Sequence, residues 1–138
     1  MKTALLSITC LISSLVLLLP AHAQHGPVTF AQLKDSMAIQ PRPVVIELYT
    51  TWCSYCRIQE KQIKRSPALQ QLLSEKYYFV SVNAESADFA AFNEIIDPLA
   101  FQRVAYPAWI ILDTRYRMKD FHAGLLKSDV LEEWLQVK

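Results

Sequence analysis

The sequence has few cysteines, and this scarcity limits the sites it can form. Only three occur among its 138 residues, and Cys10 lies in a leader that we expect to be removed, so Cys53 and Cys56 remain. A structural zinc site needs four ligands, and the further soft ligands then left are His25 and His122, neither at zinc-finger spacing. Zinc is therefore disfavoured, although a metal site stays an alternative for the cysteine pair.

The sequence also lacks an excess of charge, internal repeats and low-complexity tracts. Its formal net charge is +1, and loss of the leader, which contains Lys2, leaves 13 basic and 13 acidic residues. Proteins that bind nucleic acids or anionic membranes carry basic patches, and nothing in this composition suggests either partner. With two glycines and 52% hydrophobic residues, the chain suits one compact domain.

Residues 1–23 have the layout of a secretory signal peptide. After a positive start, Ala4–Leu19 is an apolar run, and the small-x-small pattern Ala21–Ala23 follows it. We expect cleavage before Gln24, a domain of residues 24–138, and a periplasmic or secreted location without stable membrane insertion. The alternative is an uncleaved anchor, but the 16 residues of the apolar run fall short of the roughly 20 that span a bilayer.

The hexapeptide Trp52–Arg57 carries the clearest chemical signal. Cys53 and Cys56 lie at the predicted start of a helix, where Cβ atoms three residues apart are roughly 5–6 Å from each other and can approach the roughly 3.5–4.5 Å of a disulfide. The helix start supplies unpaired N–H groups and a positive dipole end, which favour a thiolate at Cys53. A thiolate is the species that attacks disulfides, so the pair predicts a redox site.

Other interpretations of the pair stay open at this point. A Cys-x-x-Cys pair also occurs as a static disulfide or as half of a metal site. A c-type haem site would need histidine directly after the second cysteine, where this chain has Arg57. Redox chemistry remains the interpretation that the motif favours.

Hydrophobic patterning predicts an alternation of helices and strands after the leader. Val44–Tyr49 is an almost uninterrupted apolar run, typical of a central strand buried on both faces. Thr29, Ser66 and Ser128 mark helix starts, because serine and threonine cap the first free N–H groups. Helices are predicted after Thr29, over Ser54–Arg65, Pro67–Glu75 and Ala87–Ala100, the last with a break at Asp97, and after Ser128. In the helix after Ser128, the residues predicted to be buried are Val130, Leu131, Trp134 and Leu135. The other predicted strands are Tyr77–Val82, Ala108–Leu112 and Met118–Ala123.

Glu47 interrupts the apolar strand, six residues before Cys53. A buried carboxylate is costly unless it is paired or functional, and burial raises its pKa so that it can carry a proton near neutrality. The strand can place this side chain beneath the motif. The alternative is that Glu47 points to solvent from an edge strand.

The order strand, Cys-x-x-Cys, helix, strand, helix, proline, strand, strand, helix resembles the thioredoxin fold, an α/β fold with a central mixed sheet flanked by helices. Trp52, Glu47 and the strand-opening Pro107 agree with that family over about Val44–Leu135. Within the superfamily, the chain most resembles the periplasmic C-terminal domain of the membrane thiol:disulfide interchange reductases, and related small secreted thioredoxin-like proteins.

The resemblance implies a role for each of several residues. Cys53 would be the attacking thiol and Cys56 the resolving thiol, with Glu47 as proton carrier. Pro107 would be a cis proline that faces the disulfide, and with Trp52 and Tyr106 it would line an apolar groove for the substrate; plain core packing is the alternative for both aromatic residues.

Two departures from the thioredoxin pattern leave the direction of electron flow open. Ser54-Tyr55 stands between the cysteines in place of the usual Gly-Pro, and this dipeptide tunes the reduction potential. Tyr106 stands before the proline in place of threonine, closer to the Tyr-Pro of protein disulfide isomerases.

The expected function is thiol:disulfide exchange without a cofactor or metal. The protein would reduce protein disulfides of the periplasm or relay electrons to them. A membrane thiol:disulfide reductase is the candidate electron donor. The alternative is a chaperone or Cu(I)-binding module of the same fold, because soft thiolates select Cu(I). Such copper carriers tend to need a further histidine or methionine beside the pair, and Met37, Met118 and His122 are not adjacent to it in sequence.

Overall fold

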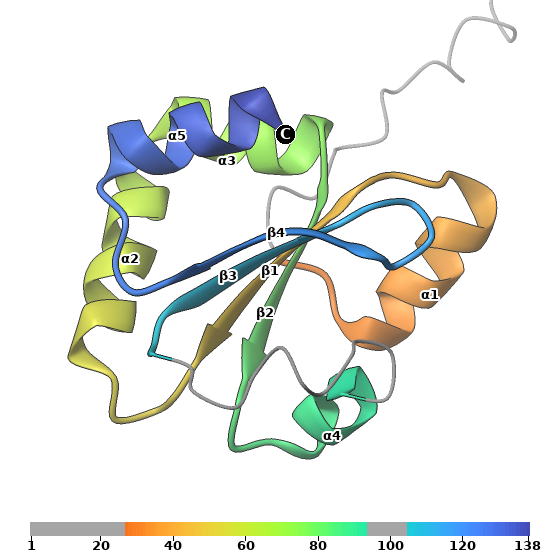
Figure 1. The fold of residues 1–138 in the computed structure, drawn as a ribbon, viewed down its shortest axis with the longest axis horizontal. Coiled ribbons are helices and arrows are strands. Elements are labelled where there is room, and N and C mark those ends of the chain that lie inside the picture. Colours follow the sequence, from red (N-terminus) through yellow and green to blue (C-terminus); the bar gives the residue numbers. More distant parts are fainter. Residues whose placement is uncertain (1–26, 94–104) are drawn as a thin grey trace, which may run out of the picture.

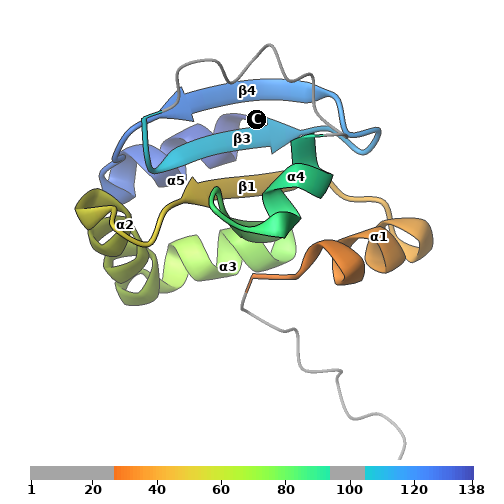
Figure 2. The same cartoon turned by 90° about the horizontal axis from the view of Figure 1, so that it is seen from below.

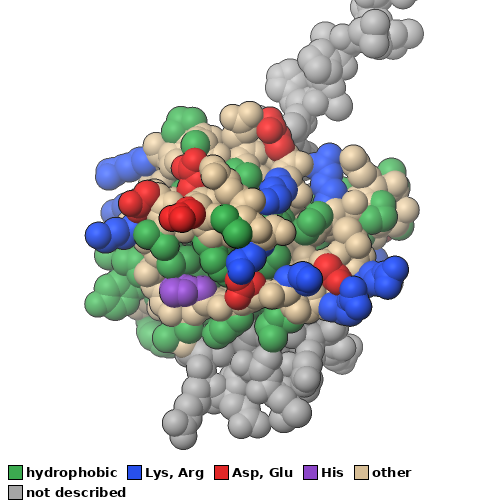
Figure 3. Space-filling view, turned by 45° about the horizontal axis from the view of Figure 1, so that its top comes forward, with side chains coloured by type: hydrophobic (Ala, Val, Ile, Leu, Met, Phe, Trp, Pro, Cys, Tyr) green, Lys and Arg blue, Asp and Glu red, His purple; other side chains and the backbone are tan. Residues whose placement is uncertain are grey.

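The computed structural model describes residues 27–93 and 105–138. The predicted signal peptide, its cleavage before Gln24 and the predicted break at Asp97 lie outside these ranges and stay predictions. No helix within the two described ranges is both long and apolar enough to cross a membrane. Basic and acidic side chains are interspersed over the face shown in Figure 3, with hydrophobic side chains between them.

A four-stranded mixed sheet forms the centre of the domain (Figure 1). Strand β1 (Val44–Tyr49) is parallel to β2 (Tyr78–Asn83) on one side and antiparallel to β3 (Ala108–Leu112) on the other. Strand β4 (Met118–Ala123) pairs antiparallel with β3, and Figure 2 shows β4, β3 and β1 following one another across the sheet. The fold class and the central position of β1 are therefore as predicted.

Helices cover both faces of this sheet. Helices α1 (Phe30–Ile39) and α4 (Ala87–Asn93) lie on one side, and α2 (Ser54–Arg65), α3 (Pro67–Glu75) and α5 (Ser128–Val137) enclose a second core on the other (Figure 1). Successive side chains of a strand point to opposite faces, so β1 contributes to both cores. Val44, Ile46 and Leu48 belong to the first core, and Val45 to the second.

Two helix starts have the predicted caps. The side chain of Thr29 accepts a hydrogen bond from the N–H of Gln32, and the side chain of Gln32 accepts one from the N–H of Thr29, which together form a capping box. Ser66 Oγ accepts the N–H of Leu69, and Pro67 opens α3. Both arrangements satisfy N–H groups that have no partner inside the helix.

The start of α5 differs from the prediction. Ser128 is the first residue of this helix, the N-cap is Lys127, and no side chain makes a capping hydrogen bond there. Val130, predicted to be buried, is 44% exposed. It is rotated by about 100° from Leu131 on the helix, whereas Leu131 and Leu135, one turn apart, are both fully buried.

Candidate active site

The two cysteines lie where the chain leaves β1 and enters α2, and they form a disulfide. Cys53 is the N-cap of α2, and the two Cα atoms are 5.3 Å apart. The N–H of Cys56 donates to Sγ of Cys53 at 3.0 Å. When the bond is open, this donor and the positive end of the helix dipole stabilise negative charge on Cys53. The helix start thus favours the thiolate at the cysteine that was predicted to attack.

Trp52 and Tyr106 form an aromatic pair next to the cysteine motif. Trp52, directly before Cys53, is 68% exposed, so it is not a core residue. Its ring meets that of Tyr106 edge to face, with the centroids 6.1 Å apart. Tyr106 is half-buried and packs at the margin of the first core. The structure therefore brings together two residues that are 54 positions apart in the sequence.

Pro107 follows Tyr106 through a cis peptide bond and is buried. Its carbonyl oxygen accepts the N–H of Gly124 at 2.7 Å. Gly124 has φ 105°, a left-handed conformation that glycine adopts without steric cost, and a Cβ atom added there would meet no atom within 4 Å. The segment after β4 is in this way attached to the start of β3.

Glu47 is 6% exposed, so the alternative of a carboxylate turned to solvent is wrong. Like Val45 it points to the second core, and its neighbour across β2 is Ser81, whose Oγ donates to Glu47 Oε2 at 3.2 Å. Burial raises the pKa of Glu47 from 4.5 to about 7; the hydrogen bond from Ser81 opposes this rise, and the negative charge of Glu60 adds to it. Glu47 can therefore take up and release a proton near neutral pH.

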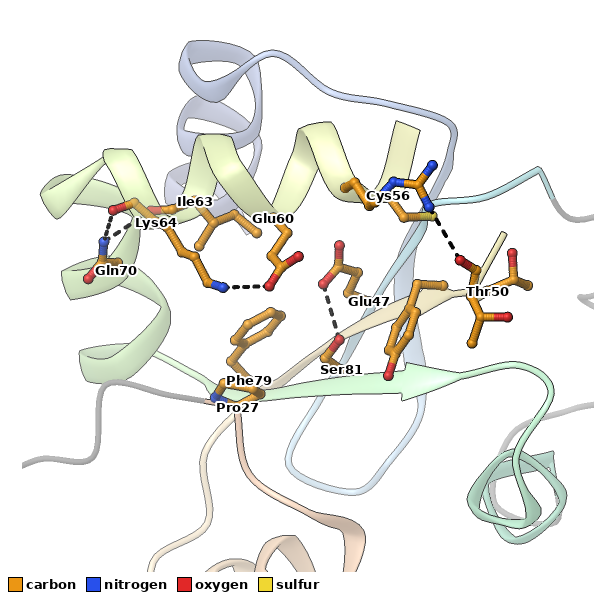
Figure 4. A pocket seen from close by; sticks show the side chains of 13 residues that line it. Pro27, Glu47, Thr50, Cys56, Glu60, Ile63, Lys64, Gln70, Phe79 and Ser81 are labelled. Carbon is orange, nitrogen blue, oxygen red and sulfur yellow. Dashed lines mark hydrogen bonds and ion pairs between the residues drawn. The ribbon is translucent and has the colours of Figure 1, made fainter. Parts of the chain in front are cut away.

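A cavity of about 460 Å³ connects Glu47 with the cysteine motif. Glu47, Cys56 and Glu60 all line it, and Figure 4 shows Glu47 extending from β1 toward α2, which carries the other two. Lys64, one turn further along α2, forms an ion pair with Glu60. Within residues 27–93 and 105–138, no group of three or more His, Cys, Asp and Glu side chains could hold a metal ion.

Comparison with known proteins places this geometry in a family. Residues 27–114 match the family model described as thioredoxin-like. The chain belongs to the thioredoxin-like family. The Cys53–Cys56 disulfide of the Cys-x-x-Cys motif lies within the matched range.

Relatives of this thioredoxin-like chain include a curated protein and several solved structures. The chain is 31% identical over 87 residues to the thiol:disulfide interchange protein DsbD of Pectobacterium atrosepticum; the match covers 62% of this chain and 14% of DsbD. The oxidised C-terminal domain of Neisseria meningitidis DsbD has a TM-score of 0.56 at 20% identity and covers 80% of this chain and 97% of that domain. A disulphide isomerase of Xylella fastidiosa has a TM-score of 0.61 at 16% identity, and the match covers 90% of this chain and 98% of the isomerase. The predicted resemblance to the DsbD C-terminal domain is confirmed.

The sequence reasoning missed Glu85, which supports the turn before the disulfide. Glu85 accepts the backbone N–H and the hydroxyl of Thr51, at 3.0 and 2.8 Å, and the indole N–H of Trp52 at 3.1 Å. The backbone hydrogen bond from Thr51 is the largest cause that lowers the pKa of Glu85. Strands β1 and β2 are parallel, so their carboxyl ends meet at one edge, and this was the signal that could have placed Glu85 beside Thr51.

The raised pKa of Glu47 in this thioredoxin-like domain leads to a prediction about stability. The native state keeps a proton that the unfolded chain releases between pH 4.5 and about 7, so the free energy of unfolding should fall as the pH rises through this window. At about 1.4 kcal/mol per pKa unit, the loss approaches about 3 kcal/mol. Urea unfolding of the oxidised wild type and of Glu47→Gln between pH 4 and 8 measures it. Identical pH dependences would show that Glu47 ionises as freely in the native state as in the unfolded chain.

Proposed function

We propose that this chain is an exported thiol:disulfide oxidoreductase that reduces protein disulfides in the periplasm or relays electrons to them. The observation that carries the proposal is the cavity beneath the motif, because Cys56 and a buried carboxylate, Glu47, line it together. A static disulfide has no need of a buried proton acceptor, whereas a cysteine that must lose its proton in each cycle does.

The reaction proceeds in two exchange steps. The Cys53 thiolate attacks one sulfur of the substrate disulfide, forms a mixed disulfide and releases the other substrate sulfur as a thiolate. Cys56 passes its proton to Glu47 and attacks Sγ of Cys53, which releases the second substrate thiolate and closes the Cys53–Cys56 bond. Two electrons have then passed from the protein to the substrate. A partner dithiol returns them by the reverse exchange.

Substrate binding is assigned to the exposed surface beside the disulfide. Trp52 and Tyr106 offer adjoining aromatic surface, with the rings 6.1 Å apart, and amphipathic aromatic residues of this kind are enriched at binding surfaces. The backbone of Tyr106, directly before Pro107, would pair with an extended substrate segment. A protein disulfide in an accessible, extended stretch of chain is the substrate class that this surface fits.

Location and partner follow from the leader and from the named relative. Residues 1–23 have the pattern of a signal peptide, and the curated relative is named a thiol:disulfide interchange protein. We assign residues 24–138 to the exported domain and a membrane thiol:disulfide reductase to the role of electron donor. The intact mass of the exported protein tests cleavage before Gln24.

Reduction of insulin driven by dithiothreitol tests the activity. The exported wild type should accelerate the reaction well above the rate with dithiothreitol alone, and Cys53→Ser should not. Equilibration with glutathione gives the reduction potential and so the direction of electron flow. Tight binding of Cu(I) by the reduced protein without any insulin reduction would instead support the copper-binding alternative.

A further inference from the structure

A polar side chain is buried on the face of α2 that meets the second core. Gln59 lies one turn after Cys56 and is fully buried. Its Oε1 accepts the backbone N–H of Leu126 at 2.9 Å, and its Nε2 donates to Oε1 of Gln62 at 3.2 Å. Its neighbours along this face, Cys56 and Ile63, are also buried. A buried amide is tolerated only when it is hydrogen-bonded, and here its oxygen is used to hold a distant segment.

That segment leads to the proline beside the aromatic pair. Leu126 comes two residues after Gly124, whose N–H donates to the carbonyl oxygen of Pro107 at 2.7 Å. The helix that carries Cys56 is thus attached through Gln59 to the chain after β4, and that chain is attached to Pro107. On the exposed side, the edge-to-face contact of Trp52 with Tyr106 makes a second connection.

We propose that Gln59 is a positioning residue that fixes the cysteine pair relative to the Tyr106–Pro107 segment, and so determines how well an extended peptide disulfide is aligned for exchange. This inference rests on the proposed function and deepens it. If the oxygen of Gln59 is removed, the N–H of Leu126 is left buried without a partner, which is strongly disfavoured. The segment from Gly124 to Leu126 must then shift to find another acceptor, and the position of Pro107 shifts with it.

The alternative is that Gln59 only satisfies a buried N–H group and stabilises the fold. The two roles predict different effects of a Gln59 substitution on the reaction rates of large and small substrates. A change in alignment harms substrates that bind to the surface proposed at Trp52, Tyr106 and Pro107, but it spares a small disulfide that reaches Cys53 without this surface. A loss of stability alone affects neither class of substrate at temperatures well below the melting temperature.

The test compares the wild type with Gln59→Met, which keeps the length of the side chain and removes the acceptor. For reduction of a peptide disulfide we expect kcat/KM to fall about tenfold, mainly through KM, because small misalignments far from the reacting atoms cost this much or more. For 5,5′-dithiobis(2-nitrobenzoic acid) we expect a change of less than about twofold, because this small disulfide needs no alignment by the proposed substrate surface.

Gln70→Met is the matched control. Gln70 Nε2 donates to the carbonyl oxygens of Ile63 and Lys64 at 3.1 and 2.8 Å, at the far end of α2. Its loss should lower the melting temperature and leave the ratio of the two substrate rates unchanged.

Each outcome decides between the possibilities. An active wild type with an unchanged rate ratio in Gln59→Met would overturn the positioning role alone, whereas a wild type inactive on both substrates would overturn the proposed function as well. If Gln59→Met does not fold, amide exchange of the wild type replaces it. The amides of Gly124 and Leu126 should then open together with those of α2, and independent opening would overturn the inference.

Discussion

A Cys56→Ser variant is expected to form a lasting covalent complex with its protein substrate. Cys53 still attacks and forms the mixed disulfide, but a serine hydroxyl cannot displace the substrate sulfur. An intramolecular thiol acts at an effective concentration far above that of free thiols in solution, so decay of the complex should slow at least about 1,000-fold. Insulin turnover should fall correspondingly. Non-reducing electrophoresis of the reduced variant mixed with substrate detects the complex, and quenched-flow sampling gives its lifetime.

Cys53→Ser is the control for this assignment of roles. The two sulfurs belong to residues of nearly equal exposure, 5% and 6%, so accessibility does not separate them. What separates them is the N–H of Cys56, which donates to Sγ of Cys53 at the helix start. Capture of substrate by Cys53→Ser, with none by Cys56→Ser, would reverse the roles of attacking and resolving thiol.

Glu47→Gln should slow decay of the mixed disulfide while its formation is nearly unchanged. A glutamine cannot accept the proton of Cys56, and loss of a general base costs about 100-fold or more. In the wild type the decay rate should rise with pH until Glu47, whose pKa is about 7, has lost its proton. In the variant this inflection near pH 7 should be absent, because the group that titrates there has been removed. Stopped-flow measurements between pH 5 and 9 separate the two steps.

Glu60→Gln serves as the matched control for Glu47→Gln. It keeps the general base and removes a negative neighbour that raises the pKa of Glu47, so the inflection of the wild-type profile should move to lower pH without a large loss of maximal rate. Decay at the wild-type rate in Glu47→Gln would assign the proton of Cys56 to another acceptor.

The fold could be predicted because its signals are local and repeated. The apolar run Val44–Tyr49 indicated a strand buried on both faces, and Ser66 followed by Pro67 marked the start of α3. The Cys-x-x-Cys pair could be predicted as a redox site from its position at a helix start alone. Glu47 was identified because a carboxylate within an apolar strand is costly to bury unless it is paired or functional, although its burial could be settled only by the positions of β2 and α2.

The residues that were missed act through long-range contacts without a local pattern. Glu85 follows β2 in a turn, where an acidic residue is ordinary, and its role appears only when parallel pairing brings it beside Thr51. Gln59 stands on a helix rich in charged residues, so its sequence neighbours suggest solvent. Its burial depends on the segment around Leu126, 67 residues away. Val130 was misassigned because neighbouring apolar positions on a helix need not share its buried face.

Gly124 combines a left-handed backbone with open space around the position of a Cβ atom. Crowding is therefore not the reason that glycine is needed here. The reason is the positive φ, which L-amino acids with a Cβ atom rarely adopt. An L-residue at this φ costs roughly 1–2 kcal/mol whatever the size of its side chain. Substitution at this position is thus limited by chirality, and a large residue is disfavoured for the same reason as alanine.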